Sequence, residues 1–121
     1  MSAGRIAIRK KLSPFKNERP EGTAIDTIVL HSMHCPVGED IFCPKTCIDW
    51  FSKCEVSSHY MIDRTGEIWQ LVENDSRAWH AGKSKMPDGR ENVNDFSIGI
   101  ELIASKDSGY EQVQMLSLIH I

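Results

Sequence analysis

One segment of the chain carries, next to its last residue, a carboxylate that could act as a general base. Residues 97–102 read Ser-Ile-Gly-Ile-Glu-Leu, an alternation that predicts a strand with its isoleucine and leucine side chains in the core. The opposite side, with Ser97, Gly99 and Glu101, is expected to stay open. A carboxylate held by strand backbone has a fixed direction, which suits proton transfer. Because most glutamates are simply solvated, a surface role for Glu101 is the alternative.

Histidines supply the second kind of candidate chemistry. His31 directly follows an apolar, β-branched run at 25–30, and ligand-binding groups are favoured at strand ends. A hydrogen-bonded structural histidine is the alternative reading of His31. His59 and Tyr60 begin another predicted strand and must point to opposite faces, so only one of them can face a cleft.

A further histidine lies beside a tryptophan in the long irregular segment 73–95. Trp79 and His80 suit contact with carbohydrate or peptide, because an aromatic face stacks on such groups while imidazole forms hydrogen bonds. The alternative is that Trp79 anchors the loop to the core, since tryptophan is usually well buried.

Composition limits the kinds of protein that can carry these residues. The 121 residues, 40% hydrophobic, suit one domain with one core. A formal charge of −3 and a pI near 5.9 give no basic footprint for nucleic acid or an anionic membrane. No transmembrane run and no secretory signal are visible, which predicts a cytoplasmic location, with an extracellular or phage-lytic role as the alternative.

Four cysteines are grouped in the first half of the chain, at positions 35, 43, 47 and 54. Without a signal peptide, free thiols are favoured over two disulfides. The spacing lacks the paired C-x2-C pattern of common structural zinc sites, so a cysteine-bound metal ranks last. A small redox or cysteine-metal protein is accordingly the weakest functional hypothesis.

The elements that must position these residues form a mixed α/β domain. Residues 1–23, with Pro14, Pro20 and Gly22, predict an arm or a loosely packed edge, and residues 24–121 form the domain. Strands are expected at about 25–30, 59–63, 67–72 and 96–103, with a turn at 64–66. Helices are expected near 44–54 and from about 110, the first with an apolar stripe of Cys47, Ile48, Phe51 and Cys54.

Four ordered blocks, at 28–31, 56–68, 77–82 and 94–102, carry a resemblance to a known family. The chain resembles the zinc-dependent N-acetylmuramoyl-L-alanine amidases of the Amidase_2 family, closest to the AmpD-type branch, and more distantly the peptidoglycan recognition proteins. The resemblance implies a single domain with a central mixed sheet flanked by helices. It also implies hydrolysis of the amide bond between N-acetylmuramic acid and L-alanine in peptidoglycan or muropeptides.

The same resemblance implies roles for individual residues. His31 would be a Zn²⁺ ligand, and Glu101 would activate the zinc-bound water. The cleft positions that would contact or shape the muropeptide site are His59, Tyr60, Trp79, His80 and Asn94. Some phage members have a catalytic tyrosine at the position of Ser58, so that role does not transfer.

The C-terminal part departs from the family pattern. Residues 110–114 resemble the opening turn of a family helix, after which members continue to a second histidine and a cysteine or aspartate ligand. Those ligands are absent here, and His120 falls too early to replace them. The chain therefore resembles a C-terminally truncated member, for which weak zinc binding, an open sheet edge and self-association are expected. The alternative function is a non-catalytic muropeptide-binding module.

Overall fold

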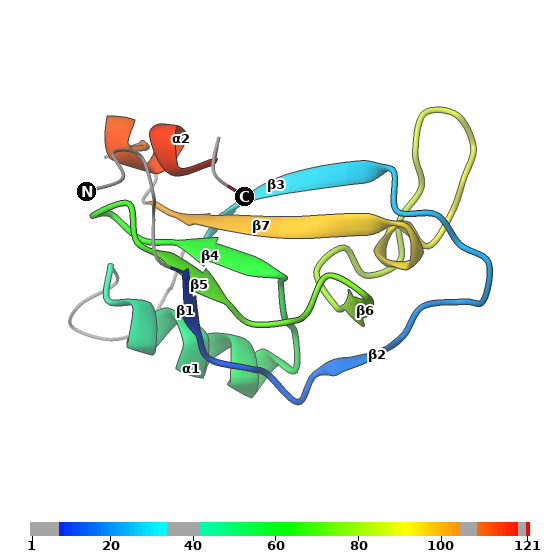
Figure 1. The fold of residues 1–121 in the computed structure, drawn as a ribbon, viewed down its shortest axis with the longest axis horizontal. Coiled ribbons are helices and arrows are strands. Elements are labelled where there is room, and N and C mark those ends of the chain that lie inside the picture. Colours follow the sequence, from blue (N-terminus) through cyan, green and yellow to red (C-terminus); the bar gives the residue numbers. More distant parts are fainter. Residues whose placement is uncertain (1–7, 34–41, 105–108, 119–120) are drawn as a thin grey trace, which may run out of the picture.

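A five-stranded mixed sheet forms the centre of the molecule (Figure 1). The computed structural model describes residues 8–33, 42–104, 109–118 and 121. The strand order is β1-β5-β4-β7-β3, and only the β4–β5 pair is antiparallel. The strands are β1 (Ile8–Lys10), β3 (Thr27–Met33), β4 (Tyr60–Ile62), β5 (Ile68–Gln70) and β7 (Ser97–Ile103).

Two long parallel strands, β3 and β7, fix the relative positions of the main candidate residues. Their register pairs Thr27 with Ser97 and continues to Met33 with Ile103, so that His31 lies directly beside Glu101. Neighbouring strands are about 4.8 Å apart, and paired residues point to the same face. The structure therefore places the predicted base and the predicted ligand side by side.

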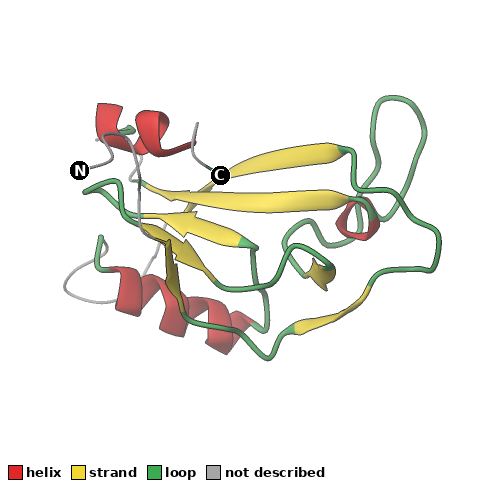
Figure 2. Ribbon diagram, viewed as in Figure 1, coloured by secondary structure: helices red, strands yellow, loops and turns green. Residues whose placement is uncertain are grey.

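One helix covers each face of the sheet (Figure 2). Helix α1 (Pro44–Cys54) has Pro44 in its first turn and ends at Glu55, whose φ of 55° is left-handed. It packs Cys47 and Phe51 against Met61 and Ile103. The predicted stripe is confirmed except at Cys54, a free thiol on the exposed side.

Helix α2 (Gln112–Leu118) lies over one end of the opposite face, where Leu118 packs against Ile62, Ile100 and Leu102. The amide of Gln114 donates to the backbone oxygens of Ile62 and Ile103, which ties the helix to the sheet. The helix predicted from about residue 110 is confirmed.

The turn between β4 and β5 is built around one carboxylate. Asp63 Oδ1 accepts hydrogen bonds from the backbone amides of Thr65 and Glu67, while Gly66 takes a positive φ of 88°. The predicted hairpin is confirmed, because the sequence supplies both the aspartate and the glycine that such a turn needs.

The N-terminal segment is paired rather than loose. Strand β1 adds to the sheet beside β5, and β2 (Lys16–Glu18) forms a second small sheet with β6 (Ser76–Ala78). Neither β6 nor the short 3-10 helix η1 (Val93–Asp95) was predicted, because each is only three residues long and has no sequence periodicity.

The burial of the sheet differs from the predicted alternation. Ser97, Gly99 and Glu101 were expected on an open face, but all three are buried. Among the described residues of the sheet, the two most exposed large apolar side chains are instead on edge strand β3, where Ile28 is 68% and Leu30 is 53% exposed. In the part of the chain that the structure describes, no helix is long and apolar enough to cross a bilayer.

Candidate active site

Glu101 lies on the α1 face of β7, between His31 on β3 and Met61 on β4. Only 7% of its surface is exposed, and burial raises the pKa of its carboxyl group to about 7. Burial has this effect because it penalises the charged form. A carboxyl group with a pKa near neutrality can both accept and return a proton, as a general base must.

His31 is partly buried and forms a pair with His80. The Nε2 atom of His31 lies 3.0 Å from Nδ1 of His80, and the two rings meet edge to face with centroids 5.2 Å apart. Burial lowers the pKa of His31. The pair brings together two predicted site residues that are 49 positions apart in the sequence.

His80 rests directly on β7. A Cβ atom built on Gly99 would lie 2.5 Å from Cγ of the His80 ring, so the ring can occupy this place only above a glycine. Its Nε2 atom lies 2.9 Å from Ser97 Oγ. Burial, followed by the positive fields of His31 and His59, lowers the pKa of His80 to about 3.

His59 is a buried support rather than an exposed contact. It has no exposed surface, its Nδ1 accepts the Gly99 amide proton, and its Nε2 donates to the backbone oxygen of Ser76. Because Gly99 N–H can only donate, the proton of His59 is assigned to Nε2. Burial lowers the pKa of His59 to about 4. The structure thus places His59 as a residue that shapes the site.

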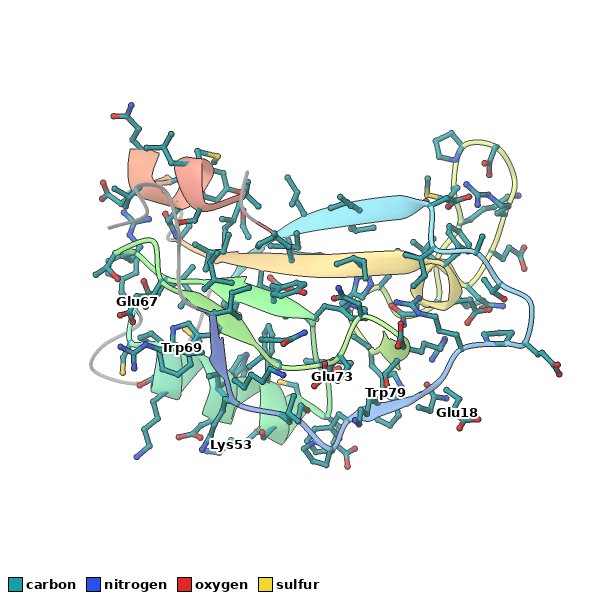
Figure 3. The ribbon with its side chains drawn as sticks, viewed as in Figure 1. Glu18, Lys53, Glu67, Trp69, Glu73 and Trp79 are labelled. Atoms are coloured by element: carbon teal, nitrogen blue, oxygen red, sulfur yellow. The ribbon has the colours of Figure 1, made fainter. Side chains whose placement is uncertain are left out.

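Asn94 and Trp79 also hold the site together. Asn94 is buried, and its Oδ1 accepts hydrogen bonds from the backbone amides of His80 and Ala81. Trp79, at the end of β6 in Figure 3, donates from Nε1 to Asn17 and packs against Phe15. Trp79 is therefore only partly available to a ligand.

Tyr60 does not join the other predicted residues. It is buried on the α2 face of the sheet among Ile62, Ile100 and their neighbours, and its hydroxyl donates to Asn74 Oδ1. Of the two side chains at the start of β4, His59 is thus the one on the face that carries Glu101. Residue His120 lies outside the described residues.

Arg19 is a site component that the sequence analysis missed. Its guanidinium donates to four backbone oxygens, those of Asn74, Asn94, Asp95 and Ser97, and it also touches His59 Nε2 at 3.1 Å. Burial lowers the pKa of Arg19. A single arginine in a polar, proline-flanked segment gives no sequence signal, whereas a glycine inside a strand, such as Gly99, does indicate a close approach.

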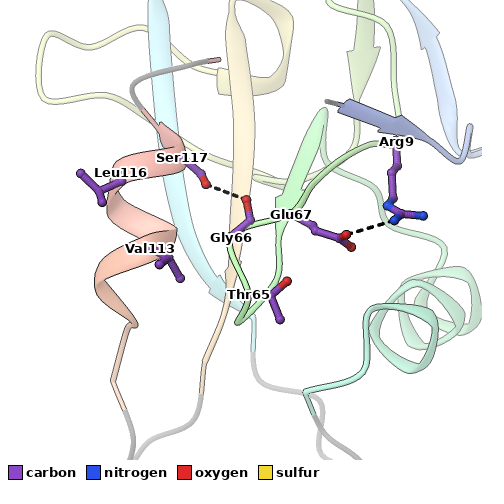
Figure 4. Close-up of a pocket in the computed structure, with 7 residues that line it drawn as sticks. All are labelled: Arg9, Thr65, Gly66, Glu67, Val113, Leu116 and Ser117. Carbon is purple, nitrogen blue, oxygen red and sulfur yellow. Dashed lines mark hydrogen bonds and ion pairs between the residues drawn. The ribbon is translucent and has the colours of Figure 1, made fainter. Parts of the chain in front are cut away.

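A cavity of about 540 Å³ lies elsewhere, between α2 and the β4–β5 turn (Figure 4). Val113, Leu116 and Ser117 line it on the helix side, and Arg9 and Glu67, which form an ion pair with each other, line it on the side away from the helix. It has no buried titratable group comparable to Glu101. The candidate chemistry is therefore on the α1 face.

The donor set for a metal is incomplete in the described residues. A catalytic zinc needs three protein ligands, and no group of three or more histidine, cysteine or acidic side chains suited to a metal occurs among the residues described here. His31 offers one nitrogen. The described residues do not by themselves fit a complete zinc site, and Cys35 lies outside them.

A comparison with protein-family models matches most of the chain to one family. The family model described as N-acetylmuramoyl-L-alanine amidase, Amidase_2, matches residues 21–121. The chain belongs to this family. The matched range contains His31, Glu101 and all the other residues that the resemblance singled out, and it extends over both helices.

Curated and solved amidases agree with this membership. The 1,6-anhydro-N-acetylmuramyl-L-alanine amidase AmpD of Escherichia coli (strain K12) is 39% identical over 127 residues, covering 89% of this chain and 68% of AmpD. A crystal structure of selenomethionine AmpD superposes with a TM-score of 0.74 at 36% identity, covering 92% of this chain and 69% of that one. The chain thus spans about two thirds of these relatives.

More distant structures share the fold. AmiD of E. coli, solved in complex with the substrate anhydro-N-acetylmuramic acid-L-Ala-D-γ-Glu-L-Lys, has a TM-score of 0.66 at 27% identity and covers 85% of this chain and 44% of AmiD. A peptidoglycan recognition protein of Alvinella pompejana has a TM-score of 0.67 at 15% identity, covering 94% of this chain and 74% of its own. The predicted fold class of this amidase-family chain is confirmed.

Proposed function

We propose that this chain is an AmpD-type amidase that hydrolyses the bond between N-acetylmuramic acid and L-alanine in a muropeptide, with Glu101 as general base. The observation that carries the proposal is the pairing of Glu101 with His31 on adjacent strands of an Amidase_2 domain. The names of the AmpD relatives and the substrate bound to AmiD support a muropeptide as substrate.

The proposed chemistry follows from the burial of Glu101. With a pKa of about 7, its carboxylate takes a proton from an attacking water near neutral pH and returns it to the amine that leaves. The walls around it are held by Asn94 and His59, whose polar atoms are engaged inside the protein. The site is thus rigid before substrate arrives, which favours a fixed direction of proton transfer.

Zinc dependence is part of the proposal, with His31 as one ligand. When bound, zinc would polarise the scissile carbonyl and lower the pKa of a bound water to about 7. Two more ligands would have to come from beyond the described residues. Zinc affinity therefore has to be tested separately from the role of Glu101, because it depends on those further ligands.

A second candidate is a binding module that holds muropeptide without cleaving it. The specific observation in its favour is the incomplete donor set among the described residues. Such a module would bind muropeptide at the same site on the α1 face as the proposed amidase, but it would not hydrolyse it.

The test is hydrolysis of anhydro-N-acetylmuramyl-tripeptide, followed by mass spectrometry of the released stem peptide. Wild-type protein is compared with Glu101→Gln, and with Glu91→Gln as an exposed control carboxylate. Each is assayed with zinc and with a chelator. The proposal predicts zinc-dependent release by the wild type and the control, and a loss of at least about 100-fold in Glu101→Gln.

The outcomes separate the two candidates. Tight muropeptide binding by calorimetry without any release of peptide would replace the amidase with the binding module. Release that persists unchanged in Glu101→Gln would refute the assignment of the base.

A further inference from the structure

The side chain of Arg19, which directly follows β2, joins three separate segments of the chain. Its Nη1 atom donates to the backbone oxygens of Asn94 and Asp95 in η1, at 3.1 and 2.9 Å. Its Nη2 atom donates to the oxygen of Asn74, between β5 and β6, at 3.0 Å, and to that of Ser97, the first residue of β7, at 2.9 Å. These bonds use all four hydrogens of the two terminal nitrogens.

The contacts of Arg19 are suited to holding backbone rather than to pairing charge. Within the described part of the chain it forms no ion pair, and its Nε–H is buried without a hydrogen-bond partner. Its contact with His59 Nε2, which itself donates to Ser76, adds no hydrogen bond. A planar guanidinium can reach four carbonyl oxygens because its donors form a rigid fork, whereas a lysine ammonium has three donors and no fork.

Asn94 transmits this restraint to one wall of the site. Arg19 holds the backbone oxygen of Asn94, and the buried side chain of Asn94 accepts hydrogen bonds from the backbone amides of His80 and Ala81 at 3.2 and 2.9 Å. The ring of His80 packs in turn against Gly99 of β7, the strand that carries the proposed base. A shift in the backbone of Asn94 would therefore move this wall relative to β7.

We propose that Arg19 is a positioning residue for muropeptide binding: it fixes the backbone of Asn94 and, through it, the segment 80–81 on the α1 face. The N-terminal segment is then a working part of the site, although the range matched by the family model, 21–121, does not include Arg19. The inference rests on the proposed function for the identity of the ligand. The contacts themselves depend neither on a metal nor on turnover.

The first test compares the muropeptide affinity of two arginine variants by calorimetry, in Glu101→Gln protein to prevent turnover. Arg19→Lys keeps the charge and loses the fork. Arg64→Met is the matched control, because Arg64 is also mostly buried and also donates to backbone oxygens, those of Ile103 and Gly109, but on the α2 side of the sheet. The Kd should rise at least about 10-fold in Arg19→Lys, the scale of one lost hydrogen bond, and stay unchanged in Arg64→Met.

Hydrolysis assays separate positioning from a loss of folded protein. A displaced wall in Arg19→Lys should raise KM and leave kcat unchanged, whereas a smaller folded fraction would lower kcat alone. Equal losses of affinity in Arg19→Lys and Arg64→Met, or wild-type affinity in a folded Arg19→Lys protein, would overturn the inference.

A double-mutant cycle tests whether Arg19 acts through Asn94. Asn94→Ala removes the acceptor of the two backbone amides and should weaken muropeptide binding by itself. The double variant with Arg19→Lys should bind about as weakly as Asn94→Ala alone, because coupled residues do not contribute additively. Additive losses would overturn the inference, and so would wild-type affinity in Asn94→Ala, whether or not the Arg19 variant folds.

Amide hydrogen exchange tests the same contacts without any ligand. In Arg19→Lys the amides of His80 and Ala81 should exchange faster than the loss of global stability explains, whereas in Arg64→Met they should follow global stability. Unchanged protection of both amides in a folded Arg19→Lys protein would overturn the inference. A wild type that binds no muropeptide would remove the proposed function instead, and the exchange rates would still decide whether Arg19 positions this segment.

Discussion

Replacing Glu101 with glutamine should stabilise the protein at alkaline pH while it removes the proposed base. The pKa of the carboxyl group is about 7 in the folded protein, against an ordinary value of 4.5. Between these values the folded state keeps a proton that the unfolded state has released, so stability falls as pH rises through this window. The full difference corresponds to about 3 kcal/mol, because each pKa unit is worth about 1.36 kcal/mol.

Urea unfolding of chelated protein measures this effect. At about pH 3, well below both pKa values, both proteins carry an uncharged side chain at position 101 in both states, so they should be similarly stable. Above about pH 7 the variant should exceed the wild type by up to about 3 kcal/mol, a rise in Tm on the order of 10 °C. The exposed control Glu91→Gln should follow the wild type at every pH. Parallel curves for Glu101→Gln and wild type would refute the claim that burial raises the pKa of the Glu101 carboxyl group.

Three further predictions concern the supports of the site and the open strand. Gly99→Ala forces the His80 ring away and should cost about 1–3 kcal/mol together with most peptide release; unchanged melting and activity would contradict the close contact. Arg19→Met removes hydrogen bonds to four backbone oxygens and should cost about 3 kcal/mol or more by urea unfolding; a loss below about 1 kcal/mol would contradict its role. We expect the wild-type protein to self-associate through edge strand β3, and replacing both Ile28 and Leu30 with lysine should abolish this association in sedimentation velocity; a wild type that is monomeric at all concentrations would contradict the prediction.

The sequence predicted the elements whose patterns are local. Helix α1 begins and ends where Pro44 and the following apolar spacing indicate, and the β4–β5 turn follows from Asp63 and Gly66. The predicted strand at 96–103 nearly matches the bounds of β7 (Ser97–Ile103), because its alternation of side chains continues over many residues. These features depend on a few neighbouring residues, which is why they can be recognised without a structure.

The burial of the candidate site could not be predicted in the same way. Alternation assigned Glu101 to an open face, but His80 and His59 come from distant segments and cover that face of β7. Arg19 reaches the site from a segment predicted as an arm, through contacts with residues more than 50 positions away. Long-range contacts of this kind leave no periodic signal in one sequence.

The residues to which the family resemblance gave roles do not all lie on the same face of the sheet. His31, His59 and His80 lie with Glu101 on one face of the sheet, whereas Tyr60 lies on the other. The blocks that resemble the family therefore identified the region of the site correctly. The alternation of side chains along each strand decides which residue of a block faces the site.

The central claim is that muropeptide binds on the α1 face, against Glu101. Its most direct test is the map of backbone amide shifts when the muropeptide is added to ¹⁵N-labelled Glu101→Gln protein. The account predicts the largest changes at residues 31, 79–81 and 99–101. Changes confined to the cavity lined by Thr65, Val113 and Ser117 would contradict it and move the binding site to the α2 side of the sheet.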